Sequence, residues 1–281
     1  MIRSSTCTLP SATRPFISPL SETRGVSNID RVKEPTAVII LVGNELLSGQ
    51  VEDVNAKFLL PELHTLGVAV KRVLMIPDEV EEIASAVREC AARFDYVFTA
   101  GGVGPTHDDL TIAGVAHAFD RRVVHDEQLK ALIEAHFGAP LRPEHLRFAE
   151  VPEGAGLIRA EQSPWPILHY ENVYIFPGVP VILRRKFEAI RHRFQAPPFA
   201  AKAVYTRQDE IDLAPLLHRL TAQFPAVAVG SYPLWPEGEY RVKVVLESKD
   251  HAALQQAFAA LTDWLDPAQI VRTESPTEVN G

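Results

Sequence analysis

Two adjacent aspartates, Asp108 and Asp109, stand near the end of a glycine-rich segment at residues 99–111. Three of the four residues at 101–104 are glycines, which allow a ligand to approach the backbone closely because they have no side chain. Backbone N–H groups in such a loop bind phosphate, and a carboxylate pair beside a phosphate makes chemical sense when a divalent cation lies between them. The segment therefore indicates a site for a phosphorylated ligand together with Mg²⁺, Mn²⁺ or Co²⁺, with both aspartates as metal ligands.

The elements around this segment place it where α/β proteins bind anions. An apolar run at 96–98 precedes it and a helical pattern at 110–119 follows it, so the loop leaves a buried strand and faces the start of a helix. Free N–H groups and the helix dipole favour a negatively charged ligand there. The expected ligand contacts in the loop come from Gly101, Gly102, Val103, Gly104 and, through its hydroxyl group, Thr106.

A simpler interpretation of part of the loop needs no ligand. Thr106 and Asp109 stand three residues apart, which resembles a capping box and would stabilise a helix by about 1 kcal/mol. That interpretation explains one threonine and one aspartate, but neither the three glycines nor Asp108. We therefore favour a functional loop, and the two interpretations are compatible.

A third carboxylate, Asp78, follows a predicted strand at 68–76. Taken alone, Asp78 is better explained as the N-cap of the next helix. Its strand is nevertheless a candidate neighbour of the strand that carries the glycine loop, and in that case Asp78 would join Asp108 and Asp109 in catalysis and metal binding. Further ligand contacts are expected from the loops after the other strands, at Glu45, Asn55, Gly178 and Pro180.

The pattern of strands and helices predicts an α/β fold with a mostly parallel sheet in a domain at 35–196. Uninterrupted or nearly uninterrupted apolar runs alternate with amphipathic helical segments, which is typical of a parallel sheet covered on both faces. The expected strands are at 37–42, 68–76, 95–100 and 173–176, and the expected helices at 53–66, around 83–94, 110–119, 126–137 and 183–194. Pro61 is expected to kink or split the first helix. The stretch from 138 to about 166 is expected to be irregular.

A second, smaller α+β domain is predicted at 199–275, after the linker-like pair Pro197-Pro198. Its strands are expected at 203–205, 227–231 and 240–246, with one helix ending near 224 and another at the end of the domain. Asp212 is expected to cap the first of these helices and to place Pro215 in its first turn. Trp235 is expected to be exposed on a turn, and the final residues look frayed.

Composition excludes some classes of function. The chain has 281 residues and a net charge of −8, which argues against nucleic acid as the main partner, since a nucleic-acid surface is usually basic. Two cysteines, Cys7 and Cys90, make a disulfide improbable and favour a reducing compartment such as the cytoplasm. No apolar run is long enough to span a bilayer. Residues 1–34 are expected to be a disordered tail, with organelle targeting by 1–28 as the alternative.

With these residues in view, the chain resembles the MoaB/Mog family of molybdopterin-binding domains. It is most similar to the CinA branch and to the molybdopterin-binding-like domain of FAD synthases. The resemblance extends over residues 36–275. It rests on the segments 43–49, 53–55, 99–111 and 176–180, on Pro-Asp-Glu at 77–79, and on 230–233 with Trp235.

The resemblance implies a three-layer α/β sandwich, followed by a small KH-like or ferredoxin-like module. It also implies that Asp78 and Asp109 take part in catalysis and metal binding, and that the protein is a homo-oligomer. The activity it implies is metal-dependent cleavage of a dinucleotide pyrophosphate such as FAD or ADP-ribose. Two alternatives remain open: adenylyl transfer in molybdenum cofactor synthesis, and a binding module without catalysis. FAD synthesis is not expected, because no synthetase domain follows. RNA binding is not expected either, because the small module has no GXXG loop.

Overall fold

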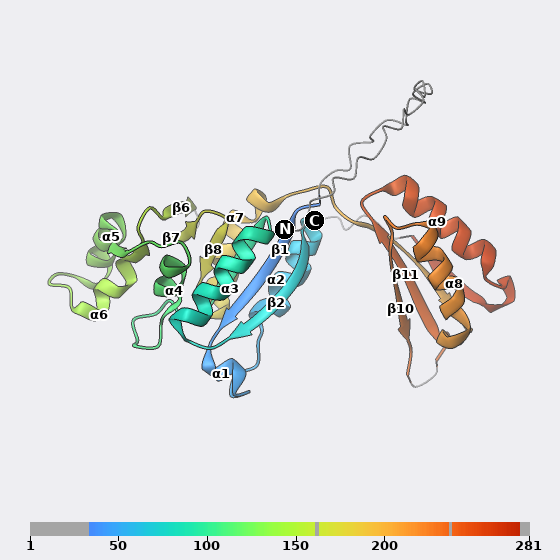
Figure 1. The fold of residues 1–281 in the computed structure, drawn as a ribbon, viewed down its shortest axis with the longest axis horizontal. Helices are drawn as coiled ribbons and strands as arrows, with labels where there is room; N and C mark the ends of the chain where they lie inside the picture. Colours follow the sequence, from blue (N-terminus) through green and yellow to red (C-terminus); the bar gives the residue numbers. More distant parts are fainter. Residues whose placement is uncertain (1–33, 161–162, 236–237, 276–281) are drawn as a thin grey trace, which may run out of the picture. The chain divides into compact units, whose positions relative to one another are not determined.

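The main feature of the fold is a six-stranded sheet with the strand order β2-β1-β3-β8-β7-β6 (Figure 1). The computed structural model describes residues 34–160, 163–235 and 238–275, so the predictions for the tail and for Cys7 lie outside it. The first four strands of the sheet are parallel to one another, β7 runs antiparallel to its neighbours β8 and β6, and β6 therefore runs in the same direction as the first four. The strands are β1 (Thr36–Val42), β2 (Ala69–Ile76), β3 (Tyr96–Ala100), β8 (Val173–Phe176), β7 (Ser163–Tyr170) and β6 (Gly156–Ala160).

The central position of β1 follows from its sequence. Every residue from Ala37 to Val42 is apolar and at most 1% exposed, so both faces of this strand are covered. Alternate side chains of β1 belong to two separate cores, with Ile39 in one and Ile40 in the other. An uninterrupted apolar run is the pattern expected of such a strand.

Helices cover both faces of the sheet and give the predicted three-layer sandwich. Two helices pack on the face of Ile39: α2 (Asn55–Thr65) and α7 (Pro180–Ile190), the latter followed by the 3₁₀ turn η2 (Arg191–Phe194). The face of Ile40 is covered by α3 (Val80–Arg93), which contains the buried Cys90, and by α4 (Thr111–Ala118).

Two details of the first helical region differ from the prediction. A short helix, α1 (Asn44–Leu47), follows β1 directly. The next helix begins at Asn55, not at Asp53, because the Asp53 carboxylate accepts hydrogen bonds from the N–H groups of Asn55 and Ala56. The helix then continues through Pro61, so of the two expected effects of this proline the split does not occur, and the kink stays a prediction.

The stretch expected to be irregular up to about 166 is largely ordered. It contains α6 (Pro143–Leu146), the 3₁₀ turn η1 (Arg147–Ala149), β5 (Glu150–Pro152), β6 and the first half of β7. Before it, the short strand β4 (Val123–His125) was not predicted, whereas α5 (Glu127–Phe137) agrees with the helix predicted at 126–137. Strand β7 was not predicted because it contains prolines, which lack the backbone N–H that donates hydrogen bonds between strands. Pro166 lies before Leu168, where the pairing of β7 with β8 begins, so only β6 pairs with that part of the strand.

The C-terminal module has its own four-stranded antiparallel sheet in the order β10-β11-β9-β12. Its strand–helix–strand–strand–helix–strand sequence is the ferredoxin-like arrangement, in agreement with the α+β prediction. The buried side chains of Val242, Val244 and Leu246 alternate with partly exposed ones along β11. The elements are β9 (Ala200–Thr206), α8 (Glu210–Gln223), β10 (Ala228–Pro233), β11 (Val242–Ser248), α9 (His251–Trp264), η3 (Pro267–Gln269) and β12 (Ile270–Glu274).

One prediction for this module is wrong and one is confirmed. Helix α8 begins at Glu210, with Asp209 as its N-cap residue, so Asp212 is not the cap and Pro215 lies inside the helix. Strand β12 pairs with β9 up to Glu274, and the final residues of the chain, which were expected to be frayed, lie outside the described residues. Trp235 is 88% exposed, as expected.

Candidate functional site

Four loops meet at the carboxyl edge of the parallel strands β2, β1, β3 and β8. Hydrogen bonds between backbone groups join these loops in pairs: Gly43 N–H donates to Ile76 O at 3.1 Å, and Gly101 N–H donates to Phe176 O at 3.2 Å. The side-chain amide of Asn55 donates to Gly178 O at 2.8 Å and so connects α2 to the turn after β8. The edge predicted to form the site is therefore one continuous surface of loops.

The glycine loop needs glycine at two positions for steric reasons. Gly101 has φ +110° and Gly102 has φ +61°, values that residues with a side chain rarely adopt. A Cβ atom on Gly101 would lie only 2.1 Å from Val42 O, and one on Gly178 would lie 3.3 Å from the Cα atom of Gly101. The glycine loop and the turn after β8 thus pack against each other.

The loop leaves backbone donors without acceptors. Thr111 fixes its base, since its hydroxyl donates to Gly101 O at 2.8 Å and its N–H donates to Gly102 O at 2.9 Å. Gly101 N–H is already engaged by Phe176 O. Within the described residues, the N–H groups of Gly102, Val103 and Gly104 have no hydrogen-bond partner. These three donors lie just before the N-terminus of α4 and suit an anion.

Asp109 closes the far end of this loop instead of capping a helix. Its Oδ2 accepts hydrogen bonds from the N–H of Thr106 at 2.8 Å and from the Thr106 hydroxyl at 2.5 Å. Helix α4 begins two residues later, and its N-cap residue is Leu110. The capping interpretation of Asp109 is therefore wrong, because the bond that would have served a helix stabilises the loop.

Arg147 holds the same loop from outside, a role that was not predicted from the sequence. The guanidinium donates to Thr106 O at 2.5 Å and to Asp109 O at 3.0 Å. Arg147 comes from η1, inside the stretch expected to be irregular. No sequence motif marks Arg147, because the residues that it contacts lie about forty positions earlier in the chain.

Asp78 also serves the site instead of the helix that follows it. Its Oδ2 accepts a hydrogen bond from the backbone N–H of Asn44 at 2.8 Å, while Glu79 is the N-cap residue of α3 and makes no side-chain cap. Strand β1 lies between β2 and β3, so the strand of Asp78 is not adjacent to the one with the glycine loop. The three aspartates nevertheless interact electrostatically.

Two carboxyl groups of the site, those of Asp78 and Asp108, have shifted pKa values. Burial raises the pKa of Asp78, and the negative charges of Glu45, Asp108 and Asp109 raise it further, against the lowering effect of the hydrogen bond from Asn44. The nearby Thr106 side chain lowers the pKa of the exposed Asp108. The repulsion around Asp78 shows that four carboxylates share this edge of the sheet.

These carboxylates do not form a ready-made metal centre. Among residues 34–160, 163–235 and 238–275, no three His, Cys, Asp or Glu side chains are arranged to hold a metal ion together. The Glu45 carboxylate folds back over the loop after β1, since a Cβ atom on Gly43 would lie 2.5 Å from its Oε1. Oxygen atoms of carboxylates are the ligands that Mg²⁺ prefers, so the chemistry of the donors fits the ion, although no complete coordination shell exists.

One buried polar atom of the site lacks a partner. Asn55 is 9% exposed, and its Oδ1 has no hydrogen-bond partner within the described part of the chain. A buried polar atom without a partner requires an explanation, and a bound ligand or water is the common one. Asn55 and Gly178, both expected to contact the ligand, are directly bonded to each other, whereas Pro180 only begins α7.

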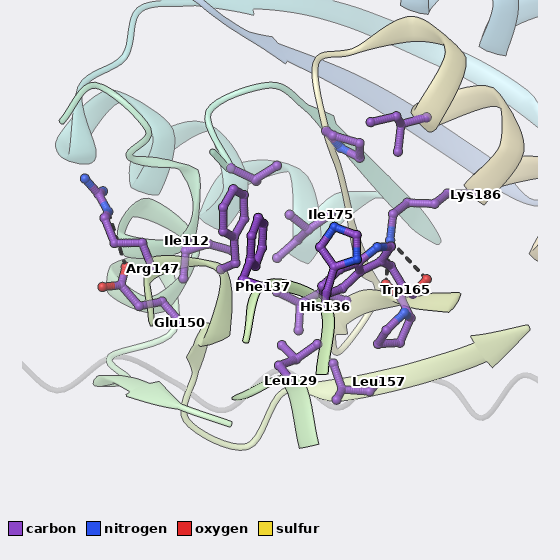
Figure 2. Close-up of a pocket in the computed structure, with 16 residues that line it drawn as sticks. Ile112, Leu129, His136, Phe137, Arg147, Glu150, Leu157, Trp165, Ile175 and Lys186 are labelled. Atoms are coloured by element: carbon purple, nitrogen blue, oxygen red, sulfur yellow. Dashed lines mark hydrogen bonds and ion pairs between the residues drawn. The ribbon is translucent and has the colours of Figure 1, made fainter. Parts of the chain in front are cut away.

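A mostly apolar cavity of about 360 Å³ opens beside the glycine loop (Figure 2). Val103 of the loop and Pro177 of the turn after β8 form part of its wall. Most of the remaining wall comes from α5, η1, β6, β7 and the start of α7, which are elements that the sequence analysis had left irregular or unassigned to the site. Its lining includes Ile112, Leu129, His136, Phe137, Phe148, Leu157, Trp165, Leu168, Ile175 and Ile182.

The charged groups of the cavity stand at opposite ends of it (Figure 2). At one end, Lys186 Nζ donates to Pro166 O at 2.5 Å and to Trp165 O at 3.3 Å. Burial lowers the pKa of Lys186 to about 8. At the other end, Arg147 Nε lies 4.0 Å from Glu150 Oε2. Arg147 thus belongs both to the cavity and to the support of the glycine loop.

A family model described as "Probable molybdopterin binding domain" matches residues 38–196. The chain belongs to this family. A second model, described as "FAD synthase, middle domain", matches residues 198–274. The resemblance inferred from the sequence motifs is thereby confirmed.

The relatives agree with the two family models. The "Probable FAD synthase" of Caenorhabditis elegans is 29% identical over 258 residues, covering 82% of this chain and 50% of its own length. A protein of Archaeoglobus fulgidus is 34% identical over 197 residues, covering 70% of this chain and 85% of its own. The chain spans about half the length of the FAD synthases that it matches.

A solved structure agrees with the fold of the first domain. The crystal structure of the protein CinA from Thermoplasma acidophilum matches with a TM-score of 0.53 and 32% identity. The match covers 57% of this chain and 97% of that one. Separately, no helix in the described residues is long and apolar enough to cross a membrane.

Proposed function

We propose that this protein binds a dinucleotide such as FAD or ADP-ribose and hydrolyses its pyrophosphate with the help of Mg²⁺, Mn²⁺ or Co²⁺. The observation that carries the proposal is the glycine loop. The N–H groups of Gly102, Val103 and Gly104 have no acceptor within the described residues, and they lie before the N-terminus of α4. The similarity to FAD synthases supports a nucleotide as the class of ligand.

The carboxylates explain why a cation would accompany this ligand. A phosphate alone would be repelled by Asp78, Asp108 and Asp109, whose charges already act on one another. Mg²⁺ is usually held by one or two carboxylates together with substrate phosphates, so a complete set of protein ligands is not needed beforehand. When bound, the cation polarises the phosphoryl oxygens and neutralises part of their charge.

The chain itself would position and stabilise the reacting group. Its free N–H groups would bind the phosphoryl oxygens on which charge develops, while Arg147 and Thr111 keep the loop in place. Water attacks one phosphorus atom, the P–O–P bond breaks, and two phosphate monoesters leave. The proton of the attacking water passes to a carboxylate of the site.

A second function uses the same loop differently. The family description supports a molybdopterin ligand, with transfer of adenylate to the pterin phosphate instead of hydrolysis. A binding module without turnover would share the loop as well. The products separate these functions: hydrolysis releases two monophosphates, adenylyl transfer joins AMP to a pterin, and the silent module changes neither ligand.

The experiment combines binding with turnover. ADP-ribose and FAD are titrated by calorimetry into the purified protein with Mg²⁺, and AMP release is followed by chromatography. Gly104→Val places a side chain toward Asp109, where even a Cβ atom would lie 2.6 Å from Oδ2. We expect this variant to lose binding and turnover, and Gly154→Ala, in a turn outside the site, to keep both. Binding that survives Gly104→Val would contradict the assigned anion site.

A further inference from the structure

The cavity lies beside the N–H groups that are proposed to hold the phosphate. Its wall is mainly apolar and aromatic, and it adjoins the glycine loop, because Val103 of that loop and Pro177 of the turn packed against it both line the cavity. A volume of about 360 Å³ falls within the range of small-molecule sites, which are typically apolar with a few polar groups that fix orientation. A ligand held by its phosphate at the loop would therefore have a preformed place for the group next to that phosphate.

The aromatic side chains suit a flat ring. The ring centroids of His136 and Trp165 lie 5.6 Å apart with planes at 77°, and those of His136 and Phe137 lie 4.7 Å apart at 89°. Phe137 is itself stacked on His145, with centroids 4.5 Å apart, and on Phe148, at 6.5 Å. A ligand ring in the cavity would therefore meet the edges of an aromatic cluster, and edge-to-face contact is an arrangement that aromatic rings favour. Phe137 is 48% exposed and Ile182 is 43% exposed, so apolar area at this cavity remains open to water.

Lys186 gives the cavity a defined polar end. An ammonium group has three N–H donors, and two of those of Lys186 are directed to Trp165 O and Pro166 O. One donor is left for an acceptor on a ligand. Figure 2 shows Lys186 and Trp165 together at one end of the cavity, with Arg147 at the other end, toward the glycine loop that it supports.

We propose that the cavity binds a fused heteroaromatic ring joined to the phosphate at the glycine loop, with an oxygen or nitrogen acceptor of the ring at Lys186. This inference rests on the proposed function, because the loop must hold the phosphate. Two ring sources share this chemistry, the flavin ring and adenine. The ring that the cavity accepts would decide which half of a dinucleotide lies in it.

The test uses calorimetry of the full chain with Mg²⁺ and three probes: FMN, AMP and ribose 5-phosphate, which lacks a ring. The ring-bearing probe that fits the cavity is expected to bind about tenfold to a hundredfold more tightly than ribose 5-phosphate, as contact of one ring with aromatic side chains contributes. Ile182→Trp fills the cavity from α7. Val181→Trp is the matched control, because Val181 is the adjacent residue of α7, is 66% exposed and does not line the cavity.

We expect Ile182→Trp to remove the advantage of the ring and to leave ribose 5-phosphate binding within about twofold, whereas Val181→Trp changes neither. If Ile182→Trp does not fold, Phe137→Ala, at an exposed side chain, provides the same comparison. The inference is overturned if FMN and AMP bind no better than ribose 5-phosphate. It is also overturned if Ile182→Trp alters only the oligomeric mass, since another copy would then fill the cavity. If ribose 5-phosphate and ADP-ribose do not bind the wild-type protein, the proposed function fails first.

Discussion

Asp78 Oδ2 accepts a hydrogen bond from the backbone N–H of Asn44 at 2.8 Å and so ties the loop after β2 to the loop after β1. The residue that made the best N-cap candidate in the sequence therefore serves the site. Its carboxylate is held among other negative charges, which raise its pKa together with burial. Because the pKa of Asp78 is higher in the folded protein than in the unfolded chain, ionisation of this carboxyl group destabilises the fold.

Asp78→Asn is expected to stabilise the protein at pH 7 while reducing turnover. The folded Asp78 ionises at higher pH than the unfolded one, so the wild-type free energy of unfolding falls as pH rises from 3.8 through the higher folded pKa. Asparagine keeps an oxygen acceptor for the N–H of Asn44 but does not ionise, so the free energy of unfolding no longer decreases with pH on account of this residue. Urea unfolding between pH 4 and pH 7 measures the effect, with the exposed Asp263→Asn on α9 as control. A less stable Asp78→Asn protein at pH 7 would contradict this assignment.

Gly104→Ala is expected to damage binding more than stability. Its backbone does not have positive φ, but the added Cβ meets Asp109 Oδ2 at 2.6 Å and crowds the free N–H groups. We expect ADP-ribose affinity to fall about tenfold to a hundredfold, because that is the typical effect of losing one hydrogen bond to a charged group. Gly154→Ala, at φ +89°, is expected to show the reverse: a stability loss of about 1 kcal/mol and unchanged binding. Equal effects of the two variants on affinity would disprove the prediction.

Arg147→Ala is expected to weaken ligand binding through the loop, since Arg147 bonds to Thr106 O and Asp109 O. Loss of two bonds to the backbone should reduce ligand affinity by about tenfold and stability by about 1–2 kcal/mol. Arg147→Lys, which restores a cation but not the two-pronged geometry, should recover part of the affinity. The control is Arg142→Ala, whose side chain bonds to His145 in the same region. An affinity that Arg147→Ala leaves intact would exclude the support role.

Lys186 is expected to make stability depend on alkaline pH. Burial lowers its pKa to about 8, so between about pH 8 and 10.5 the unfolded chain binds more protons there than the folded chain. The free energy of unfolding therefore gains from this residue as pH rises through that window, by on the order of 3 kcal/mol at most. Denaturant unfolding at pH 7.5, 9 and 10 should show this gain in the wild type and in the exposed control Lys57→Met. Lys186→Met should lack it, and a slope that persists in Lys186→Met would assign the effect elsewhere.

Much of the fold could be predicted because its signals are local. The apolar run of β1 and the amphipathic stripes of α3 and α7 determine which faces are buried. Strand β7 was missed because Pro166 breaks the pattern of a strand, although it lies where only one neighbour pairs with β7. Strand β12 was missed because its last three residues are exposed, as on the edge of a sheet.

The site was predictable only in part. The turn residues of the glycine loop carry a backbone requirement that is readable in the sequence, as the positive φ of Gly101 and Gly102 shows. The partners of these residues were not readable, because Arg147 and the cavity around Trp165 come from distant elements. The two capping interpretations, at Asp78 and Asp109, failed for one reason: a carboxylate near a helix start also accepts hydrogen bonds from a loop.

The most direct test of the central claim is AMP release from FAD and ADP-ribose by wild type and Asp109→Asn, with Mg²⁺, Mn²⁺ or Co²⁺ and with chelator. Asparagine keeps an acceptor for Thr106 and removes one carboxylate charge, so the loop should persist while metal-assisted hydrolysis is lost. We expect the wild type with metal to release AMP from at least one substrate and to release none with chelator, and we expect Asp109→Asn to release it about a hundredfold or more slowly. AMP release that is equal in both proteins, or absent from the wild type with every metal, would contradict it.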